Sequence, residues 1–99
     1  MDNETKYYVY AISSQVKNYI YVGLTNNLRR RFSDHNLGYN KTTKPYKPFT
    51  LFYTKAYNSR IYARKHEKYL KSGVGKEFLK SLRKLVPGRR QLNSSPPAD

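Results

Sequence analysis

The stretch from Tyr21 to Gly38 constrains the fold of this chain more than any other, because a strand pattern changes there into a helix pattern. Its sequence is YVGLTNNLRRRFSDHNLG. Apolar residues alternate with others before the two asparagines, which predicts the end of a strand. Asn26 or Asn27 can cap a helix over 27–37, and the glycine at its end can terminate it. The stretch therefore predicts a strand, a tight turn and a short helix.

Two side chains of this predicted helix face the same way. Arg31 and His35 are four residues apart and therefore project from one side. With Tyr21 on the preceding strand, they form an arrangement beside Gly23 that can grip a phosphate. Each residue also has an ordinary alternative. Arg31 can be a surface charge like Arg30, and His35 can complement the dipole at the helix end.

A second strand-like segment, KYYVYAIS, precedes this stretch at residues 6–13. Together with residues 19–25 it predicts an antiparallel hairpin. If the loop is symmetric about the Gln15–Val16 bond, Tyr10 lies directly opposite Tyr21, and the two rings share one face. The alternative is that both are ordinary core tyrosines, and a slip of one residue would put them on opposite faces.

The remaining sequence predicts one more strand and two more helices. Residues 49–57 alternate like a strand, residues 60–71 read as a helix, and 76–86 as another. Ser72, Gly73 and Gly75 are expected to break the chain between the two helices. The order ββαβαα predicts an α+β fold, with a small three-stranded antiparallel sheet flanked by helices.

The length of 99 residues predicts one domain. We expect it to span residues 6–86. A flexible segment over 1–5 and a disordered, proline-containing tail over 87–99 are expected to flank it.

The charge of the chain predicts a polyanionic partner. Its formal net charge is +14, from 20 Lys and Arg against 6 Asp and Glu, and such self-repulsion is costly. Nucleic acid is the first candidate and an anionic membrane surface the second, while solubility alone is the ordinary alternative. The candidate nucleic-acid contacts are Arg30, Lys41, Lys44, Lys47, Lys71 and Lys76.

Several classes of site are excluded. The chain has no cysteine, which excludes disulfides and cysteine zinc sites and fits an intracellular, cytoplasmic protein. It has only two histidines, which excludes a histidine-rich metal cage. Of these, His66 is expected to serve packing or the surface. No apolar run approaches the ~20 residues of a membrane span, and the N-terminal sequence is unlike a signal peptide.

Glu67 is one of three carboxylates in residues 5–98. It shares a helix face with Ala63 and Leu70, and we expect that face to turn inward. The ordinary interpretation is an ion pair with Lys71, four residues further on. The alternative is a metal ligand, because Mg²⁺ is often held by one or two carboxylates, with water and substrate phosphate completing its shell.

Five elements now stand in order along the chain: Tyr8-Val9-Tyr10, Tyr21-Val22-Gly23, Arg31, His35 and Glu67. In type, order and spacing they resemble the GIY-YIG endonuclease superfamily, over roughly residues 6–85, as in a small stand-alone member. Two departures accompany this resemblance. Tyr8 stands where many members have glycine, and the later asparagine of many members has no counterpart in KSGVGKEFLKSL. Lys71 or Lys76 can occupy that space.

The resemblance implies an endonuclease that hydrolyses phosphodiester bonds, most readily in DNA, with one Mg²⁺ or Mn²⁺ held by Glu67. It implies that Arg31 contacts the phosphate and that Tyr10 accepts the proton of the attacking water. A free phenol is a weak base at pH 7, and we expect the nearby metal and the excess of cations to favour its phenolate. His35 would orient or relay the proton, and Tyr21 would position water or phosphate.

Alternatives of a different class remain open at this point. The chain can be a binding module that keeps the fold without catalysis, or an accessory subunit of a larger nuclease complex. In a domain this small, substrate choice comes from the basic surface or from a protein partner. A structure-specific role in repair or recombination, near the nucleoid of a bacterium, fits the same reasoning.

Overall fold

The structure is a computed structural model that describes residues 5–85. The tail over 87–99, and all but Thr5 of the segment expected to be flexible, lie outside the described residues. The described elements follow the order ββαβαα, which confirms the fold class. The strands are β1 (Tyr7–Ser14), β2 (Ile20–Thr25) and β3 (Phe49–Tyr57), and the helices are α1 (Leu28–Leu37), α2 (Arg60–Lys71) and α3 (Gly73–Lys84), with a short 3-10 turn, η1 (Lys44–Tyr46), before β3.

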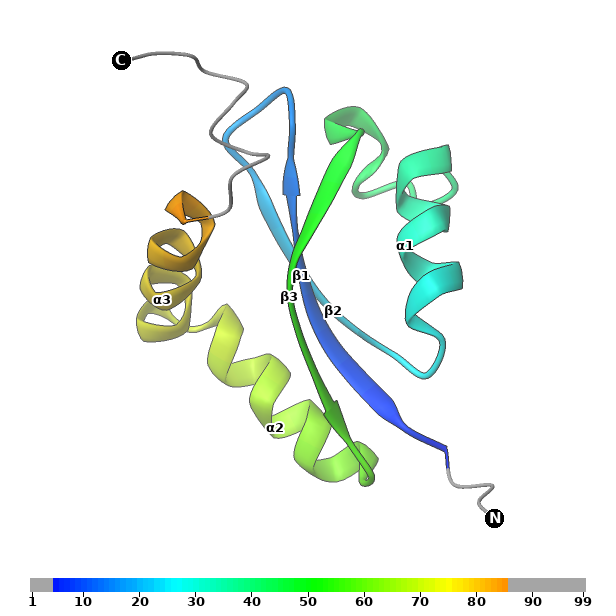
Figure 1. The fold of residues 1–99 in the computed structure, drawn as a ribbon, viewed down its shortest axis with the longest axis vertical. Helices are drawn as coiled ribbons and strands as arrows, with labels where there is room; N and C mark the ends of the chain where they lie inside the picture. Colours follow the sequence, from blue (N-terminus) through cyan, green and yellow to red (C-terminus); the bar gives the residue numbers. More distant parts are fainter. Residues whose placement is uncertain (1–4, 86–99) are drawn as a thin grey trace.

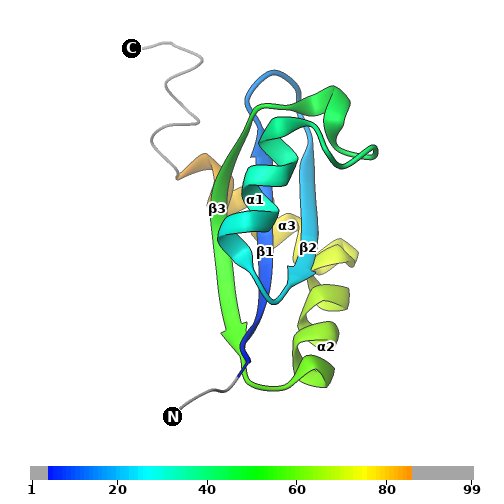
Figure 2. The same ribbon diagram turned by 90° about the vertical axis from the view of Figure 1, so that its right-hand side faces the viewer.

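The three strands form one antiparallel sheet in the order β2-β1-β3. Helix α1 covers one face of this sheet, while α2 and α3 cover the other (Figures 1 and 2). The central strand β1 is therefore covered on both faces, and β2 is an edge strand. No helix within residues 5–85 is long and apolar enough to cross a membrane.

Alternation along β1 builds a separate half of the core on each face. Val9 and Ala11 pack with Leu70 and other apolar residues toward α2 and α3. Tyr10 and Ile12 pack in a mainly aromatic cluster on the face covered by α1. All four β1 residues are at most 1% exposed, because both faces of the strand are covered. The Tyr10 hydroxyl, in this aromatic half of the core, forms part of the candidate site.

The hairpin register differs by two residues from the expected one. Tyr10 pairs with Gly23, and Tyr21 pairs with Ile12. The turn explains this shift. The Ser14 hydroxyl accepts hydrogen bonds from the backbone N–H groups of Val16 and Lys17, at 3.1 and 3.0 Å, and the centre of the loop moves by one residue. An even shift leaves each side chain on its face, so Tyr10 and Tyr21 share one face as expected.

Helix α3 starts earlier than expected, at Gly73, and no loop separates it from α2. Ser72 ends one helix and caps the next, since its hydroxyl donates to the Tyr69 carbonyl at 2.6 Å and accepts from the Gly75 N–H at 3.2 Å. A Cβ at Gly75 would overlap backbone atoms of Tyr69 and Leu70. Here a glycine permits close helix packing instead of breaking the helix.

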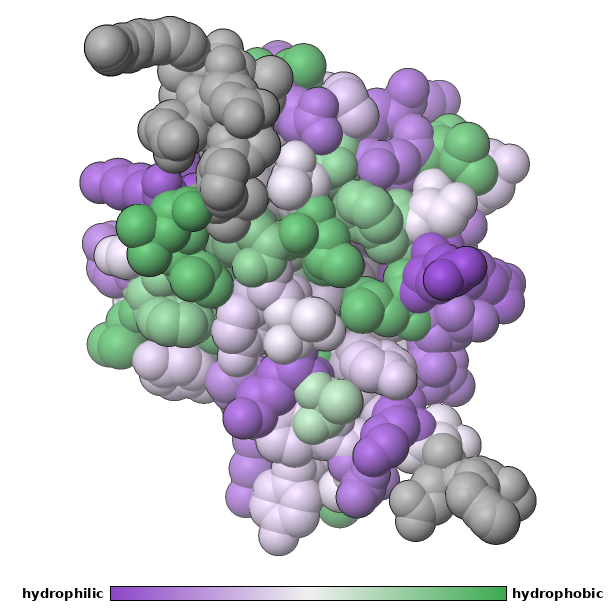
Figure 3. Space-filling view, in the orientation of Figure 1, coloured by the Kyte–Doolittle hydropathy of each residue, from purple (hydrophilic) through white to green (hydrophobic). Residues whose placement is uncertain are grey.

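The surface is divided between apolar and polar areas. Figure 3 shows hydrophobic residues gathered over β3 and α3, and mostly hydrophilic residues over α1. Asn27 caps α1 through its side chain, and Gly38 ends it with a φ of 85°, as the sequence predicts. This polar helix places His35 against Tyr10 of the central strand.

Candidate active site

Three of the predicted site residues meet on the α1 face of the sheet. The Tyr10 hydroxyl lies 2.8 Å from Nε2 of His35. The ring centroids of Tyr10 and Tyr21 are 6.4 Å apart, and those of Tyr21 and His35 are 5.0 Å apart. The three side chains come from β1, β2 and α1, so regular elements fix their positions.

Gly23 leaves the space that the Tyr10 hydroxyl fills. A Cβ built on Gly23 would lie 2.5 Å from the Tyr10 oxygen and 2.6 Å from the adjacent ring carbon. No side chain can therefore occupy this position without moving Tyr10. The glycine of the second motif thus allows the hydroxyl of the first motif to sit against the β2 backbone.

A residue that the sequence did not single out completes this arrangement. Thr43, in the loop between α1 and η1, is fully buried, and its Oγ1 lies 2.8 Å from Nδ1 of His35. His35 is also fully buried, and both ring nitrogens have a partner. In the sequence, Thr43 looks like any threonine of a polar loop. The only available signal is that a buried histidine needs a partner for its second nitrogen.

Burial sets the protonation of the pair. Burial, and secondarily the nearby Tyr21, raise the pKa of Tyr10 to about 12, although the Arg31 guanidinium opposes this. Burial also lowers the pKa of His35 to about 4, with the charge of Arg31 contributing. The protein's own cations therefore do not favour a Tyr10 phenolate as we expected, because the loss of hydration outweighs their charge. At neutral pH both groups are uncharged.

Arg31 lies beside this neutral pair. Its charge contributes to lowering the pKa of His35 and opposes the rise in the pKa of Tyr10. It forms an ion pair with Asp34, with a distance of 3.9 Å between Nη1 and the carboxylate oxygen. The side chain stays partly exposed. Arg31 can therefore meet an anion from solvent next to the pair.

Glu67 approaches the site from the other face of the sheet. It belongs to α2 and is 5% exposed, so its helix face turns inward as expected. It pairs with Lys71 at 3.1 Å, the expected ion pair, and also with Arg64 at 2.5 Å. Its charge is one of the smaller influences that raise the pKa of Tyr10, after burial. Glu67 is therefore within electrostatic range of the pair.

The residues present fit a weakly chelated, oxygen-preferring cation. Within residues 5–85 no three or more His, Asp or Glu side chains group as metal ligands. A site here has one protein carboxylate, Glu67, and must draw its other ligands from water and substrate. Mg²⁺ and Mn²⁺ accept such a shell, whereas zinc requires more protein ligands.

The predicted nucleic-acid contacts are spread over the surface, not gathered at one point. Arg30 and Arg31 line a hollow of about 130 Å³ at the start of α1. Lys41, Lys44 and Lys47 are exposed around the buried Thr43. The other two predicted contacts lie toward α2 and α3, where Lys71 pairs with Glu67 and Lys76 lines a separate groove.

Among solved structures, the chain is similar to the UPF0213 protein BH0048 from Bacillus halodurans, determined by solution NMR. The two share 31% sequence identity with a TM-score of 0.51, and the match covers 85% of this chain and 92% of that chain. No curated protein gives a significant match.

The family-level comparison agrees with the site geometry. The model of the GIY-YIG catalytic domain matches residues 6–80, most of the chain, and spans both tyrosines, Gly23, Arg31, His35 and Glu67. Such domains are typically nucleases, which makes nucleic acid the substrate class. With this match and the fold described above, the chain belongs to the GIY-YIG family of nucleases.

Proposed function

We propose that this protein is a divalent-metal-dependent endonuclease that hydrolyses phosphodiester bonds in DNA. The observation that carries the proposal is the neutral Tyr10–His35 pair, 2.8 Å apart, held against Gly23 beside a partly exposed arginine. This arrangement offers a proton path and an anion contact in the same place. Glu67 adds a carboxylate within electrostatic range.

Arg31 binds the scissile phosphate. Its guanidinium is always charged and offers a planar fork of donors that matches two phosphate oxygens. Because Asp34 is 3.9 Å away, the fork is not fully engaged by that carboxylate. The same contact stabilises the additional negative charge that builds on the phosphate in the transition state.

Tyr10 and His35 move the proton of the attacking water. As the water oxygen bonds to phosphorus, one of its protons passes to the Tyr10 oxygen, and the Tyr10 hydroxyl proton passes to Nε2 of His35. No free phenolate is needed, which suits a phenol whose pKa is about 12. The bond to the leaving oxygen breaks in the same displacement, and that oxygen takes a proton from water. His35, whose pKa is about 4, then returns the proton it received to solvent by way of Tyr10. Thr43 holds the imidazole in place through Nδ1.

Glu67 would hold the divalent cation, and its neighbours permit this. Arg64 and Lys71 pair with it through side chains that are about half exposed, so both can withdraw into solvent. A bound cation would supply positive charge that offsets the charge developing on the leaving oxygen. Tyr21, half-buried between Tyr10 and the solvent, positions water or phosphate.

One observation favours a second candidate. Both Glu67 oxygens already contact cationic side chains, Arg64 and Lys71, as they would in a module that binds nucleic acid without cutting it. In that case the chain acts as a binding module or as an accessory subunit of a nuclease complex. In either case we place the protein inside the cell, with substrate choice set by its basic surface or by a protein partner.

The test is a cleavage assay on a panel of duplex, flapped, branched and single-stranded DNA, with Mg²⁺, Mn²⁺ or chelator. We expect cleavage with either metal, most readily on a branched substrate, and none with chelator. Glu67→Gln should bind the same DNA as well as the wild type and cut it far more slowly. Glu77→Gln removes an exposed carboxylate outside the site and serves as the matched control.

Two outcomes would contradict parts of the proposal. Normal cleavage by Glu67→Gln would remove the metal assignment. Binding without metal-dependent cleavage on any substrate would favour the binding module.

A further inference from the structure

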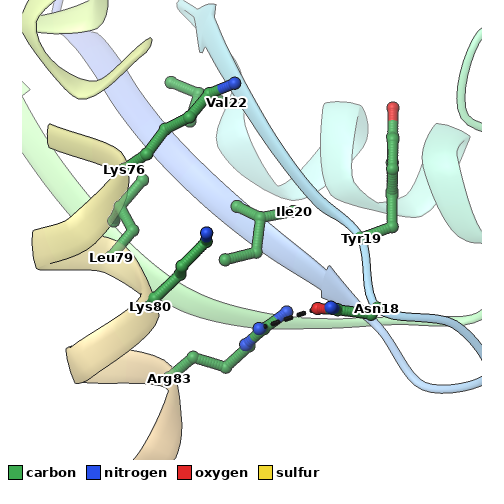
Figure 4. Close-up of a pocket in the computed structure, with 8 residues that line it drawn as sticks. All are labelled: Asn18, Tyr19, Ile20, Val22, Lys76, Leu79, Lys80 and Arg83. Atoms are coloured by element: carbon green, nitrogen blue, oxygen red, sulfur yellow. Dashed lines mark hydrogen bonds between the residues drawn. The ribbon is translucent and has the colours of Figure 1, made fainter. Parts of the chain in front are cut away.

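A groove lies between α3 and the β1–β2 hairpin, on the face of the sheet opposite to Tyr10. Its volume is about 350 Å³. The residues that line it come from β2, the turn before β2 and one side of α3 (Figure 4): Asn18, Tyr19, Ile20, Val22, Lys76, Leu79, Lys80 and Arg83.

Three cations stand in a row along this groove. Lys76, Lys80 and Arg83 follow the helical spacing that places them on one side of α3, about 6 Å apart for the first pair. Figure 4 shows Lys76 beside Val22 and Lys80 beside Ile20. No carboxylate lines the groove. The row is therefore a continuous positive wall facing an edge strand.

The groove has a fixed shape at its far end. The Arg83 guanidinium donates to the Asn18 side-chain oxygen at 2.9 Å, which ties α3 to the hairpin turn (Figure 4). Lys80 pairs with Glu77 at 3.7 Å, but both side chains are more than half exposed. Such an exposed pair is weak and leaves the Lys80 ammonium available to another anion.

The groove opens on the same strand as the candidate site. Val22 lines the groove. The next residue, Gly23, contacts the Tyr10 hydroxyl on the opposite side of β2. β2 is an edge strand, so within residues 5–85 no strand covers its outer side. A polymer that places one phosphate at Arg31 can pass over this edge and continue along α3.

We propose that the Lys76–Lys80–Arg83 groove binds the sugar-phosphate backbone of the nucleic-acid segment that flanks the scissile phosphate. This inference rests on the proposed function. The Tyr19 ring points away from the three cations (Figure 4) and stacks on Tyr46 at 3.8 Å, so it is not a platform for bases in the groove. The contacts are to backbone alone and carry affinity without sequence information.

The groove fits a nucleic-acid strand better than a lipid surface. Binding to an anionic membrane needs cations on a face that presents apolar side chains outward for insertion. Val22 and Leu79, which line the groove, are buried. The exposed apolar residues of α3, Val74 and Phe78, lie by helical spacing on the side of the helix away from the three cations. A chain of phosphates can follow the recessed row, whereas a flat layer of headgroups cannot.

The test measures how binding depends on salt when the three groove cations are replaced by glutamine. Binding of the full chain to a branched DNA is titrated in chelator, so that the DNA stays intact, at several salt concentrations. Each lost phosphate contact should lower the slope of log K against log salt by about 1, so the triple variant should lose about 3. The matched control replaces Lys6, Lys55 and Lys65, at the opposite end of the sheet, and should lose less than half as much.

Several outcomes would overturn the inference. An equal loss of slope in the groove and control variants means that net charge alone matters, and the proposed function then stands without the groove. No binding of wild-type protein to any DNA or RNA would remove the proposed function as well. Vesicles rich in phosphatidylserine form a further arm, and a groove effect seen only there would make a membrane the occupant.

A folding control keeps the result interpretable. Arg83 is partly buried and bonded to the hairpin, so its loss can disturb the fold. The double variant Lys76→Gln/Lys80→Gln changes only exposed side chains and should lose about 2 in slope with an unchanged melting temperature. A double variant with wild-type slope contradicts the inference.

Discussion

The sheet carries a tyrosine–histidine pair on each face, and the two pairs lie in different surroundings. On the α1 face, the Tyr10 hydroxyl lies 2.8 Å from His35. On the opposite face, the Tyr53 hydroxyl lies 2.7 Å from Nε2 of His66, which belongs to α2. A hydrogen bond between these residue types is therefore not, by itself, a mark of a catalytic site.

The surroundings of the two pairs separate them. His35 is fully buried, its second nitrogen contacts Thr43, and its tyrosine partner rests on Gly23 beside Arg31. His66 is only half-buried and packs among the rings of Tyr53, Tyr57 and Tyr69. A nearby arginine that can contact an anion, and a gap for the hydroxyl, therefore distinguish a pair that can move a proton from a pair that only packs.

The largest predicted effect comes from filling that gap. Gly23→Ala places a Cβ 2.5 Å from the Tyr10 oxygen, so the ring must move away from His35 or Arg31. We expect overpacking to cost about 1–3 kcal/mol of unfolding free energy and cleavage to disappear. Urea unfolding and a cleavage assay measure both. Gly73→Ala, where no atom lies within 4 Å, is the control and should be neutral or slightly stabilising.

The next effect is a dependence of folding stability on pH, to which His35 should contribute more than His66. The folded-state pKa of His35 is about 4, below the ordinary 6.5, so the unfolded chain binds more protons between these values. Stability should therefore fall as pH falls, by about 2 kcal/mol from pH 7 to pH 5. Urea unfolding at both pH values, for wild type and His35→Gln, isolates this contribution. An identical pH effect in both proteins would show that His35 is not the source.

His66 should contribute to the same pH dependence to a smaller extent. Burial, followed by the charge of Lys55, also lowers its pKa, so it adds a loss of the same sign. Because its ring is half-buried, we expect His66→Gln to remove less of the pH dependence than His35→Gln. A larger effect from His66 would invert the assignment of the buried pair.

The smallest effect concerns the support of His35. Thr43→Val keeps the shape of a fully buried side chain and removes the hydroxyl at Nδ1. Leaving one buried nitrogen without a partner should cost about 1–3 kcal/mol in unfolding free energy, at the low end because the rest of the pair is intact. Cleavage should slow only modestly. Thr54→Val on exposed β3 is the control, and equal melting temperatures for the two variants would count against a supporting role for Thr43.

Much of the fold follows from local patterns in the chain. The bounds of α2 and β3 match those expected from period and caps, and the other strands differ by one residue. Tyr10 and Tyr21 share a face because strand parity survives a shift of two in register. The start of α3 could not be predicted from local patterns. Gly75 lies against the backbone of α2, and a sequence pattern does not show this contact between helices.

The residues of the site were easier to predict from the sequence than their protonation states and supporting contacts. Sequence spacing brought together Tyr10, Tyr21, Arg31 and His35, and the structure places them side by side. It did not reveal Thr43, whose role depends on a loop folding back on α1. It also missed the effect of burial on the pKa of Tyr10, because the net charge is visible in a sequence whereas burial is not.

Under the proposed function, the Tyr10–His35 pair, and not the Tyr53–His66 pair, moves the proton in cleavage. Initial rates of DNA cleavage with Mg²⁺, measured for Tyr10→Phe and Tyr53→Phe alongside wild type, test it most directly. Each variant deletes one hydroxyl bonded to a histidine. We predict a fall of about 10²–10⁴-fold for Tyr10→Phe, with DNA binding retained, and a rate near that of wild type for Tyr53→Phe. Equal rates in the two variants, or the larger loss in Tyr53→Phe, would contradict the account.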